Sequence, residues 1–298
     1  MLAIVIPYYK LKFFQETLQS LANQTDQRFK VYIGDDASLE SPSYLLELYK
    51  NHFNFEYYRF EDNLGGISLV KQWERCMIMI NGEKWLMILG DDDVLENNCV
   101  ASFYKNLEEI EALKISAIRF STRVINSKGE SISENYSHPK IESTGDFLMR
   151  KLNGGTRSSL SEYIFEKEII EQIKFKDFPL AWNSDLLAVL EFSRWNNIFT
   201  INEAIVCFRL SGMNITSKKD NLIIKNNATF QFYFYLLHEQ TNKLSKELIG
   251  VLFDRFEKTI LDNKKHAIYW VKLFYLYLKF FQIKRFLSLG FKIKKSIK

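Results

Sequence analysis

The 298-residue sequence predicts an α/β protein with a doubly wound parallel sheet. Short apolar runs alternate with segments of helical periodicity in its first third, and the connections between them are short. Polar clusters follow three of the apolar runs, at residues 7–10, 35–38 and 91–93. Because ligands bind beyond the carboxyl ends of the strands in such sheets, these clusters predict a nucleotide-binding site.

The individual elements follow from the periodicity of the sequence. The first run, Leu2 to Ile6, is continuous and is ended by Pro7, as is typical of a buried parallel strand. We expect further strands at 29–34, 55–60 and 84–89, and helices at 13–22, 44–51 and 67–80.

The pattern changes after residue 97, where helices and strands no longer alternate strictly. From residue 221 onward the sequence is helix-forming and rich in Phe, Tyr and Lys. We expect helices at 98–113, 143–152 and 183–195, strands at 115–125 and 161–165, and a polar hairpin or loop at 126–143.

The composition is that of an ordinary globular protein, with 47% apolar and 26% charged residues. The three cysteines, Cys76, Cys99 and Cys207, are far apart and odd in number, so we expect reduced, mostly buried thiols rather than disulfides or a zinc cluster.

The N-terminus shows no basic lead and no cleavable apolar segment, which argues against a signal peptide. We therefore expect a cytoplasmic protein.

The formal net charge of +4 conceals an asymmetry along the chain. Residues 263–298 hold ten Lys or Arg and no Asp or Glu, so the remainder holds 30 basic and 36 acidic residues, a net charge of −6. A nucleic-acid-binding protein that is basic throughout would not have this distribution. We expect no nucleic-acid partner.

Five motifs together resemble family 2 glycosyltransferases, over residues 2–215. The resemblance implies a GT-A fold, a Rossmann-like mixed sheet flanked by helices, with a catalytic domain at 1–215 and a helical, basic extension at 216–298. It also implies a nucleotide-diphosphate sugar donor, a divalent cation (Mn²⁺ or Mg²⁺) and inversion at the anomeric carbon. The motifs are Ile4-Val5-Ile6-Pro7-Tyr8-Tyr9, Glu16 to Leu21 with Gln24-Thr25, Asp35-Asp36-Ala37-Ser38, Asn63-Leu64-Gly65-Gly66 and Leu89-Gly90-Asp91-Asp92-Asp93.

The aspartate triple has a chemical rationale of its own. A diphosphate repels carboxylates, so a hard cation with oxygen ligands must mediate between them. The resemblance implies Asp92 and Asp93 as metal ligands and Asp91 near the ribose, although Gly90 stands where the family has its first aspartate, which leaves the register open. The alternative is a solvated acidic turn.

The resemblance also implies contacts to the nucleotide. Asp36 matches a carboxylate that binds the base, for which a uracil imide is a good partner. Tyr9 matches an aromatic residue against the base, and Pro7 supplies backbone in the same loop; packing at a strand end is the alternative for Tyr9. Lys71 falls near the family's basic residue and would contact phosphate, unless it is an exposed helical lysine.

Inversion requires a carboxylate that accepts the proton of the acceptor hydroxyl. Asp185 matches the family's aspartate at the start of a helix, where Asn183 or Ser184 can cap. The helix dipole alone would also favour an acid there, which is the structural alternative. In the segment that closes the family's catalytic domain, Arg209, Ser211 and Asn214 could fold over the diphosphate or form a loop without ligands.

Residues 267–281 are apolar and aromatic, but they are too few to span a bilayer, which needs about 20 residues. Trp, Tyr and Lys on such a helix suit an anionic membrane surface, at the inner face of the cell membrane. A helix packed on the catalytic domain is the alternative. Lys272 and Lys279 interrupt the segment, and Lys284, Arg285, Lys292, Lys294, Lys295 and Lys298 follow it.

Together with the resemblance to family 2 glycosyltransferases, these features predict a hexosyltransferase-type enzyme. It would move a sugar from a UDP-sugar to a hydroxyl of a saccharide or lipid-linked saccharide. The lipid-linked acceptor, and a role in cell-surface polysaccharide or glycolipid biosynthesis, are expected by analogy. A nucleotidyltransferase would need a Gly-rich phosphate loop after the first strand, and residues 7–12 contain no Gly. A carbohydrate-binding or scaffold protein would not need both the acidic triple and Asp185.

Overall fold

The computed structural model describes residues 1–218 and 220–296, with side chains as far as Leu289. The chain divides into two compact units, Met1–Asn221 and Leu222–Lys298. Four lysines expected in a membrane-facing basic tail have side chains outside the described residues: Lys292, Lys294, Lys295 and Lys298.

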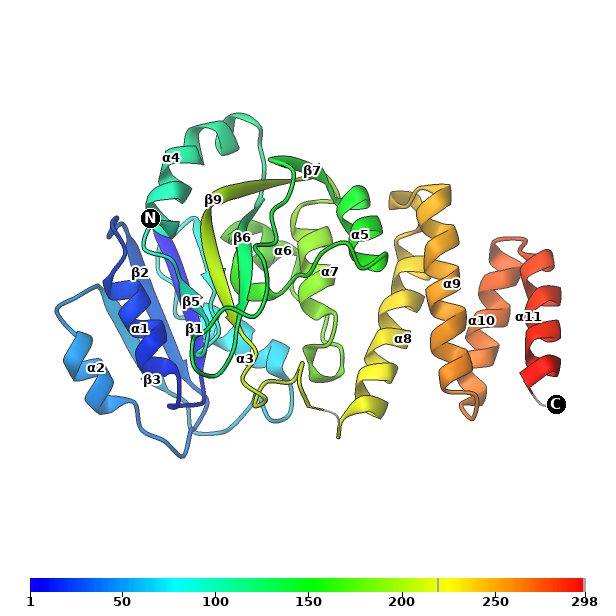
Figure 1. The fold of residues 1–298 in the computed structure, drawn as a ribbon, viewed down its shortest axis with the longest axis horizontal. Coiled ribbons are helices and arrows are strands. Elements are labelled where there is room, and N and C mark those ends of the chain that lie inside the picture. The colour runs from blue at the N-terminus through cyan, green and yellow to red at the C-terminus, as the bar shows by residue number, and fades with distance from the viewer. Residues whose placement is uncertain (219, 297–298) are drawn as a thin grey trace. The chain divides into compact units, whose positions relative to one another are not determined.

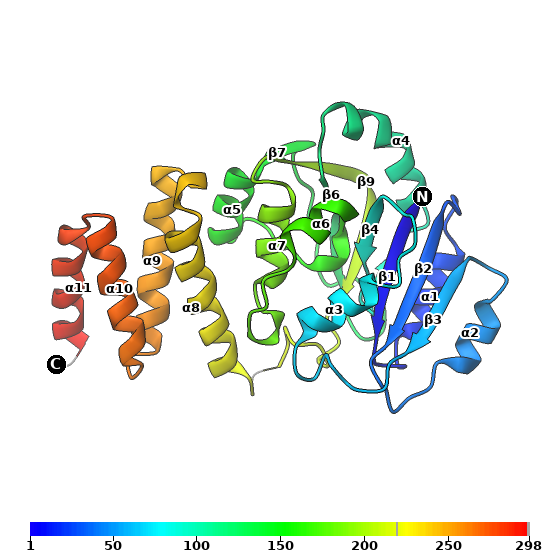
Figure 2. The same ribbon diagram turned by 180° about the vertical axis from the view of Figure 1, so that it is seen from behind.

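The first unit contains a central sheet whose first four strands are parallel, as expected (Figures 1 and 2). They lie in the order β3, β2, β1, β4, so that β1 occupies the middle and is buried along almost its whole length. The strands are β1 (Leu2–Tyr8), β2 (Phe29–Asp35), β3 (Phe55–Arg59) and β4 (Trp85–Ile88).

Beyond β4 the sheet is mixed, and the mixed GT-A sheet implied by the resemblance is confirmed. β8 (Tyr163–Glu166) runs antiparallel to both β4 and β6 (Ala117–Ile125), and β6 is parallel to β9 (Asn197–Arg209). β5 (Val94–Leu95) and β7 (Ile141–Ser143) both pair antiparallel with β9. The long strand β9 was not predicted, because the polar residues Asn202 and Glu203 interrupt its apolar run.

Helices cover both faces of this sheet. On one face α1, α2 and α4 share a continuous apolar core with Leu2, Ile4 and Ile6 of β1. On the other face α3 packs on β1 and β2, while α6 and α7 pack on β8; Figure 1 shows α1 in front of the strands and Figure 2 shows α3 there. These helices are α1 (Phe14–Ala22), α2 (Ser43–Tyr49), α3 (Leu69–Met77), α4 (Cys99–Ala112), α6 (Lys167–Ile173) and α7 (Ser184–Phe192), and α5 (Thr144–Leu152) follows β7.

A glycine sets how closely α3 approaches the sheet. A Cβ atom on Gly34 of β2 would lie 2.3 Å from Sγ of Cys76 on α3, so no larger residue fits at this contact. Cys76, Cys99 and Cys207 are all buried free thiols, as expected.

The second unit is helical. It consists of α8 (Leu222–Glu239), α9 (Lys246–Asp262), α10 (Ala267–Lys279) and α11 (Ile283–Ser296). Among the described helices, none combines the length and the apolarity that crossing a bilayer requires.

We predict that Gly34→Ala destabilises the protein by about 1–3 kcal/mol, because the added methyl group overpacks the contact with Cys76. Thermal unfolding measures the change. Gly145→Ala is the matched control, since its Cβ would lie 3.8 Å from Ser143 Oγ, an ordinary contact. Adding Cys76→Ala to Gly34→Ala should recover part of the loss; strictly additive effects would show that the two positions do not interact.

Candidate functional site

The ends of β1, β2 and β4 are joined by direct hydrogen bonds. The backbone N–H groups of Tyr9 and Lys10 donate to Oδ2 of Asp91 over 2.8 and 2.7 Å. The N–H of Asp36 donates to the carbonyl of Tyr8 over 3.0 Å, and the Ser38 hydroxyl donates to the carbonyl of Tyr9 over 2.6 Å. The three polar clusters singled out in the sequence therefore meet at one edge of the sheet.

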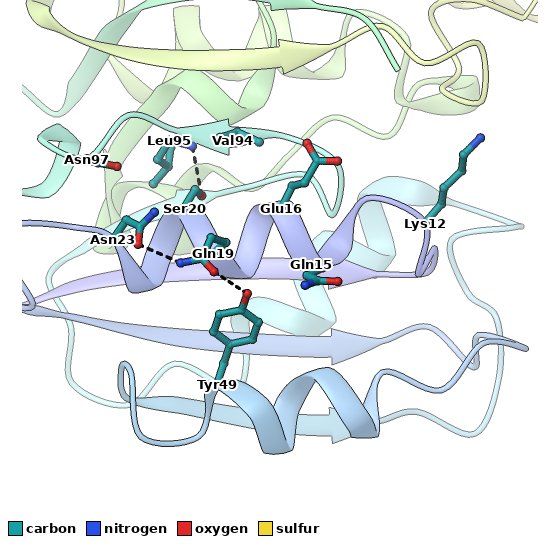
Figure 3. Close-up of a pocket in the computed structure, with 10 residues that line it drawn as sticks. All are labelled: Lys12, Gln15, Glu16, Gln19, Ser20, Asn23, Tyr49, Val94, Leu95 and Asn97. Carbon is teal, nitrogen blue, oxygen red and sulfur yellow. Dashed lines mark hydrogen bonds between the residues drawn. The ribbon is translucent and has the colours of Figure 1, made fainter. Parts of the chain in front are cut away.

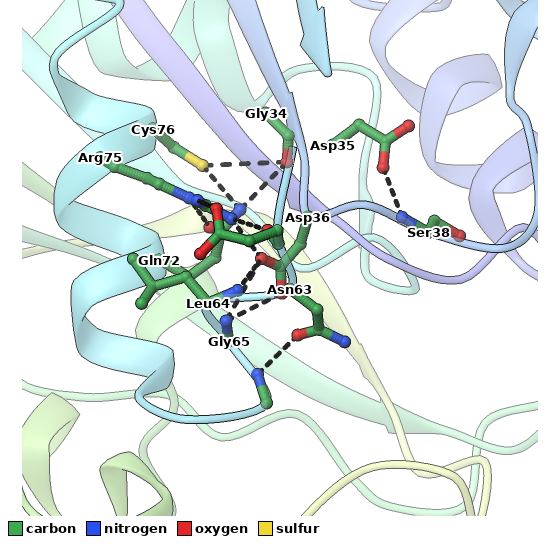
Figure 4. A network of polar contacts seen from close by, with 12 residues as sticks. Gly34, Asp35, Asp36, Ser38, Asn63, Leu64, Gly65, Gln72, Arg75 and Cys76 are labelled. Atoms are coloured by element: carbon green, nitrogen blue, oxygen red, sulfur yellow. Dashed lines mark hydrogen bonds and ion pairs between the residues drawn. The ribbon is translucent and has the colours of Figure 1, made fainter. Parts of the chain in front are cut away.

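Asp36 is held in a cradle of donors (Figure 4). Its Oδ1 accepts from Leu64 N over 2.8 Å and from Arg75 Nη2 over 2.6 Å, whereas among the described residues Oδ2 accepts only from Gly65 N, over 3.0 Å. A Cβ on Gly65 would lie 2.4 Å from Oδ2, which explains the glycine. Burial raises the pKa of Asp36, and the amides and Arg75 oppose this shift.

The basic side chain that reaches Asp36 is Arg75, which the sequence reading overlooked. Lys71 lies one turn earlier on α3, where its side chain is exposed and its backbone N–H donates to the capping hydroxyl of Ser68. The spacing of four residues puts both cations on one side of the helix. Only Arg75 reaches Asp36 at the end of β2, and it also pairs with Asp62 over 2.7 Å.

Asp93 points into the protein. Its Oδ1 accepts from the backbone N–H of Arg209 over 2.9 Å and its Oδ2 accepts from the Ser161 hydroxyl over 2.5 Å. A Cβ on Gly90 would lie 2.9 Å from the same Oδ2. A larger residue at position 90, where the family resemblance places an aspartate, would therefore meet the carboxylate of Asp93.

Asp92 differs from its two neighbours, because within the described residues no hydrogen bond or ion pair reaches its carboxylate. Burial and the negative charges of Asp93 and Asp91 raise its pKa to about 8. Such a carboxylate fits a divalent cation, which would relieve the repulsion. No group of three or more His, Cys, Asp or Glu in the described part of the chain forms a complete metal site. A cation here would take its remaining ligands from phosphate oxygens and water.

Arg209 does not fold over a diphosphate, contrary to one of our expectations. Its side chain is fully buried and donates to the carbonyls of Asp92 and Asn126 and, over 2.5 Å, to Oε2 of Glu16. Its guanidinium also lies 4.5 Å from the centre of the Phe13 ring. Because all three guanidinium nitrogens donate to protein oxygens, Arg209 stabilises the acidic turn from inside the protein.

Asp185 lies half-buried in the first turn of α7, as expected. The capping expectation was wrong: Asn183 is the N-cap residue in a left-handed conformation, with no capping hydrogen bond from its side chain. The hydroxyl of Ser184 instead accepts from the N–H of Phe178. Burial raises the pKa of Asp185, and the charges of Lys151 and Arg157 oppose this shift.

Arg157 links the region of Asp185 to the acidic turn, and the sequence reading missed it. Its charge acts on the pKa of both Asp93 and Asp185. The guanidinium is held by Glu162 over 2.8 Å and lies 4.5 Å from the centre of the Phe208 ring. Arg157 sits in a Gly- and Ser-rich loop with no periodicity, so nothing local in the sequence indicated its position.

A separate surface cavity of about 380 Å³ runs along α1 (Figure 3). It is bordered by Tyr49 of α2 and by Val94 and Leu95 of β5, and none of the expected site residues lines it. The candidate site is therefore the edge of the sheet formed by the strand ends.

Comparisons with known proteins agree with this architecture. A family model for glycosyl transferase family 2 matches residues 3–160. Glycosyltransferase GlyG of Streptococcus pneumoniae serotype 4 is 21% identical over 113 residues, which are 38% of this chain and 36% of GlyG. The match thus spans about a third of that relative.

Two solved structures of TarS from S. aureus share the fold. One superposes with a TM-score of 0.61 and 15% identity, over 87% of this chain and 43% of that chain. The other, TarS 1–349 in complex with UDP-GlcNAc, gives a TM-score of 0.60 and 16% identity, over 87% of this chain and 80% of that chain. The chain therefore has the GT-A fold, and it spans less than half of the longer TarS chain.

We predict that Arg75→Leu destabilises the protein by about 3–5 kcal/mol, because it leaves the buried carboxylate of Asp36 without its cation. Chemical denaturation measures the loss. Lys71→Leu replaces the exposed lysine one turn earlier on α3, and it should change the free energy of unfolding by less than about 0.5 kcal/mol. Adding Asp36→Asn to Arg75→Leu should recover part of the stability, and no recovery would show that the ion pair is not the cause.

Proposed function

Because this chain belongs to glycosyl transferase family 2, we propose that it is an inverting, metal-dependent glycosyltransferase that uses a UDP-sugar. The observation that carries the proposal is the meeting of three strand ends, where Asp91 accepts the amides of Tyr9 and Lys10 and Asp36 lies beside Tyr8. Ligands bind at such an edge in α/β sheets.

The nucleotide would lie across the ends of β1 and β2. Tyr9 is 40% exposed and offers a ring for stacking on the base, with the backbone at Pro7 beside it. Oδ2 of Asp36 accepts one hydrogen bond from the described residues and has capacity for a uracil imide N–H. Asp91 would lie near the ribose. The complex of TarS 1–349 with UDP-GlcNAc, which has a similar fold, supports a uridine nucleotide.

The diphosphate and its cation would lie beside the acidic turn. Asp92, whose carboxylate accepts no hydrogen bond from the described residues, would hold Mg²⁺ or Mn²⁺. Asp93, the second ligand that the resemblance implies, already accepts from Ser161 and from the N–H of Arg209, so it would contribute mainly negative charge. When bound, the cation would neutralise charge on the departing diphosphate. Lys71, exposed on α3, would supply a positive charge toward the phosphates.

Asp185 would act as the catalytic base. Its carboxylate would accept the proton of the acceptor hydroxyl while that oxygen attacks the anomeric carbon and the nucleoside diphosphate departs. Burial raises the pKa of Asp185, which makes its carboxylate a stronger base, and the charges of Lys151 and Arg157 favour the ionised form.

The acceptor we propose is a saccharide or lipid-linked saccharide in cell-surface polysaccharide or glycolipid biosynthesis. The support for a lipid-linked acceptor is an exposed apolar surface in the second unit, which is described below.

UDP with Mn²⁺ should raise the melting temperature by several degrees, since a ligand at 100 times its Kd stabilises by about 2.7 kcal/mol.

Asp92→Asn should weaken Mn²⁺-dependent UDP binding at least about tenfold. The same variant should be more stable than the wild type without metal, because a repelled, buried carboxylate is removed. Glu108→Gln, at an exposed position on α4, is the control. Unchanged UDP titrations for Asp92→Asn would argue against the metal site.

Asp185→Asn should lower turnover by about 10²–10⁴-fold and leave UDP-sugar affinity unchanged, because the base acts on the acceptor. Steady-state transfer assays and donor titrations measure the two quantities. Asp146→Asn, at the exposed first turn of α5, is a matched control for the helix dipole. Near-normal turnover of Asp185→Asn would exclude the base role.

A further inference from the structure

Helix α10 carries apolar residues on two opposite faces. One face packs inside the helical unit, where Tyr269 stacks on Phe230 with ring centres 3.6 Å apart and Tyr277 stacks on Phe253. The opposite face is open to solvent, with Val271 62% and Leu278 59% exposed. A helix needs only one apolar face to pack in a bundle, so the second face requires another explanation.

The exposed face continues onto α11. The rings of Phe274 and Phe286 lie 5.5 Å apart in an edge contact, which joins the two helices at the surface. Figure 1 shows α10 and α11 side by side and antiparallel. We define the α10–α11 patch as Val271, Phe274, Leu278, Phe281, Ile283 and Leu287, all of which are exposed.

The turn between the two helices adds a second observation. Phe281 is 87% exposed and has a φ of 53°, a left-handed backbone conformation that is uncommon for a bulky residue. A large apolar side chain is thus exposed to water at this turn. A residue in this conformation commonly follows a helix, and here the N–H of Gln282 donates to the carbonyl of Tyr277 and closes the end of α10.

The segment that carries the patch has charges of one sign. Residues 263–298 contain ten Lys or Arg and no acidic residue. Some of these cations have protein partners: Arg285 pairs with Asp254 over 2.6 Å, and Lys279 donates to the carbonyl of His238. Lys284 lies beside Ile283 on α11 with its side chain exposed.

We propose that the α10–α11 patch docks on an anionic lipid bilayer, with its apolar side chains at the headgroup level and the lysines against the lipid phosphates. Large apolar side chains bordered by Lys are the composition of helices that lie in the membrane interface. The absence of acidic residues from 263–298 favours an anionic lipid surface over a second copy of this patch, since two copies would bring like charges together. Binding is peripheral and does not depend on glycosyl transfer.

Co-sedimentation with vesicles tests the proposal on the full chain. Wild-type protein should bind phosphatidylcholine vesicles that contain phosphatidylglycerol, should bind pure phosphatidylcholine vesicles far less, and should be released by high salt. Leu278→Ser with Phe281→Ser should weaken binding on the order of tenfold or more. Lys284→Glu should weaken binding to the anionic vesicles only.

Ile223→Ser replaces an equally exposed aliphatic residue on α8, outside the patch, and should bind as the wild type does. Retained UDP binding and an unchanged circular dichroism spectrum would show that each variant is folded. Undiminished vesicle binding by the double variant would overturn the proposal. A wild-type dimer that becomes a monomer in the double variant, with no vesicle binding by either, would overturn it in favour of contact between copies.

Discussion

Three consecutive carboxylates at the end of β4 can be held together only if donors from distant segments meet them. Asp91 receives two amides from the end of β1, and Asp93 receives the Ser161 hydroxyl and the N–H of Arg209 on β9. The buried guanidinium of Arg209 binds the carbonyl of Asp92 in the same turn. The acidic turn therefore ties β1, β4 and β9 together, and Asp92 is left as the carboxylate without a donor among the described residues.

Close approach is the second constraint on this edge of the sheet. Gly65 and Gly90 lie where a Cβ would collide with the carboxylates of Asp36 and Asp93, and Gly34 allows α3 to lie against β2. At Gly65 and Gly90 the missing side chain makes room for a carboxylate, and at Gly34 it makes room for the helix. Gly65 and Gly90 thus indicate how closely the protein backbone encloses the carboxylates of Asp36 and Asp93.

The two units differ in where their charged residues lie and in what neutralises them. In the first unit, buried acids are paired with arginines that come from other elements, as in the contacts of Asp36 with Arg75 and of Glu162 with Arg157. In the second unit, cations predominate and exposed apolar residues border them. Salt screens such buried pairs much less than it screens the interactions of exposed lysines.

The sequence was sufficient to predict the parallel strands β1 to β4, their helices and the polar clusters at the strand ends. These features depend on local periodicity and on chain order, since the end of a parallel strand always lies at the same edge of the sheet. It also indicated Asp185 at a helix start. Local signals sufficed there because the first turn of a helix is recognisable from a few residues.

Which side chains meet depends instead on how distant segments pack. Periodicity places Lys71 and Arg75 on one side of α3, but only packing against β2 selects Arg75 as the partner of Asp36. Likewise the antiparallel direction of β8, the burial of Arg209 and the position of Arg157 depend on contacts between segments far apart in the chain. A sequence pattern shows which residues share a face of an element, and the neighbouring element determines what that face touches.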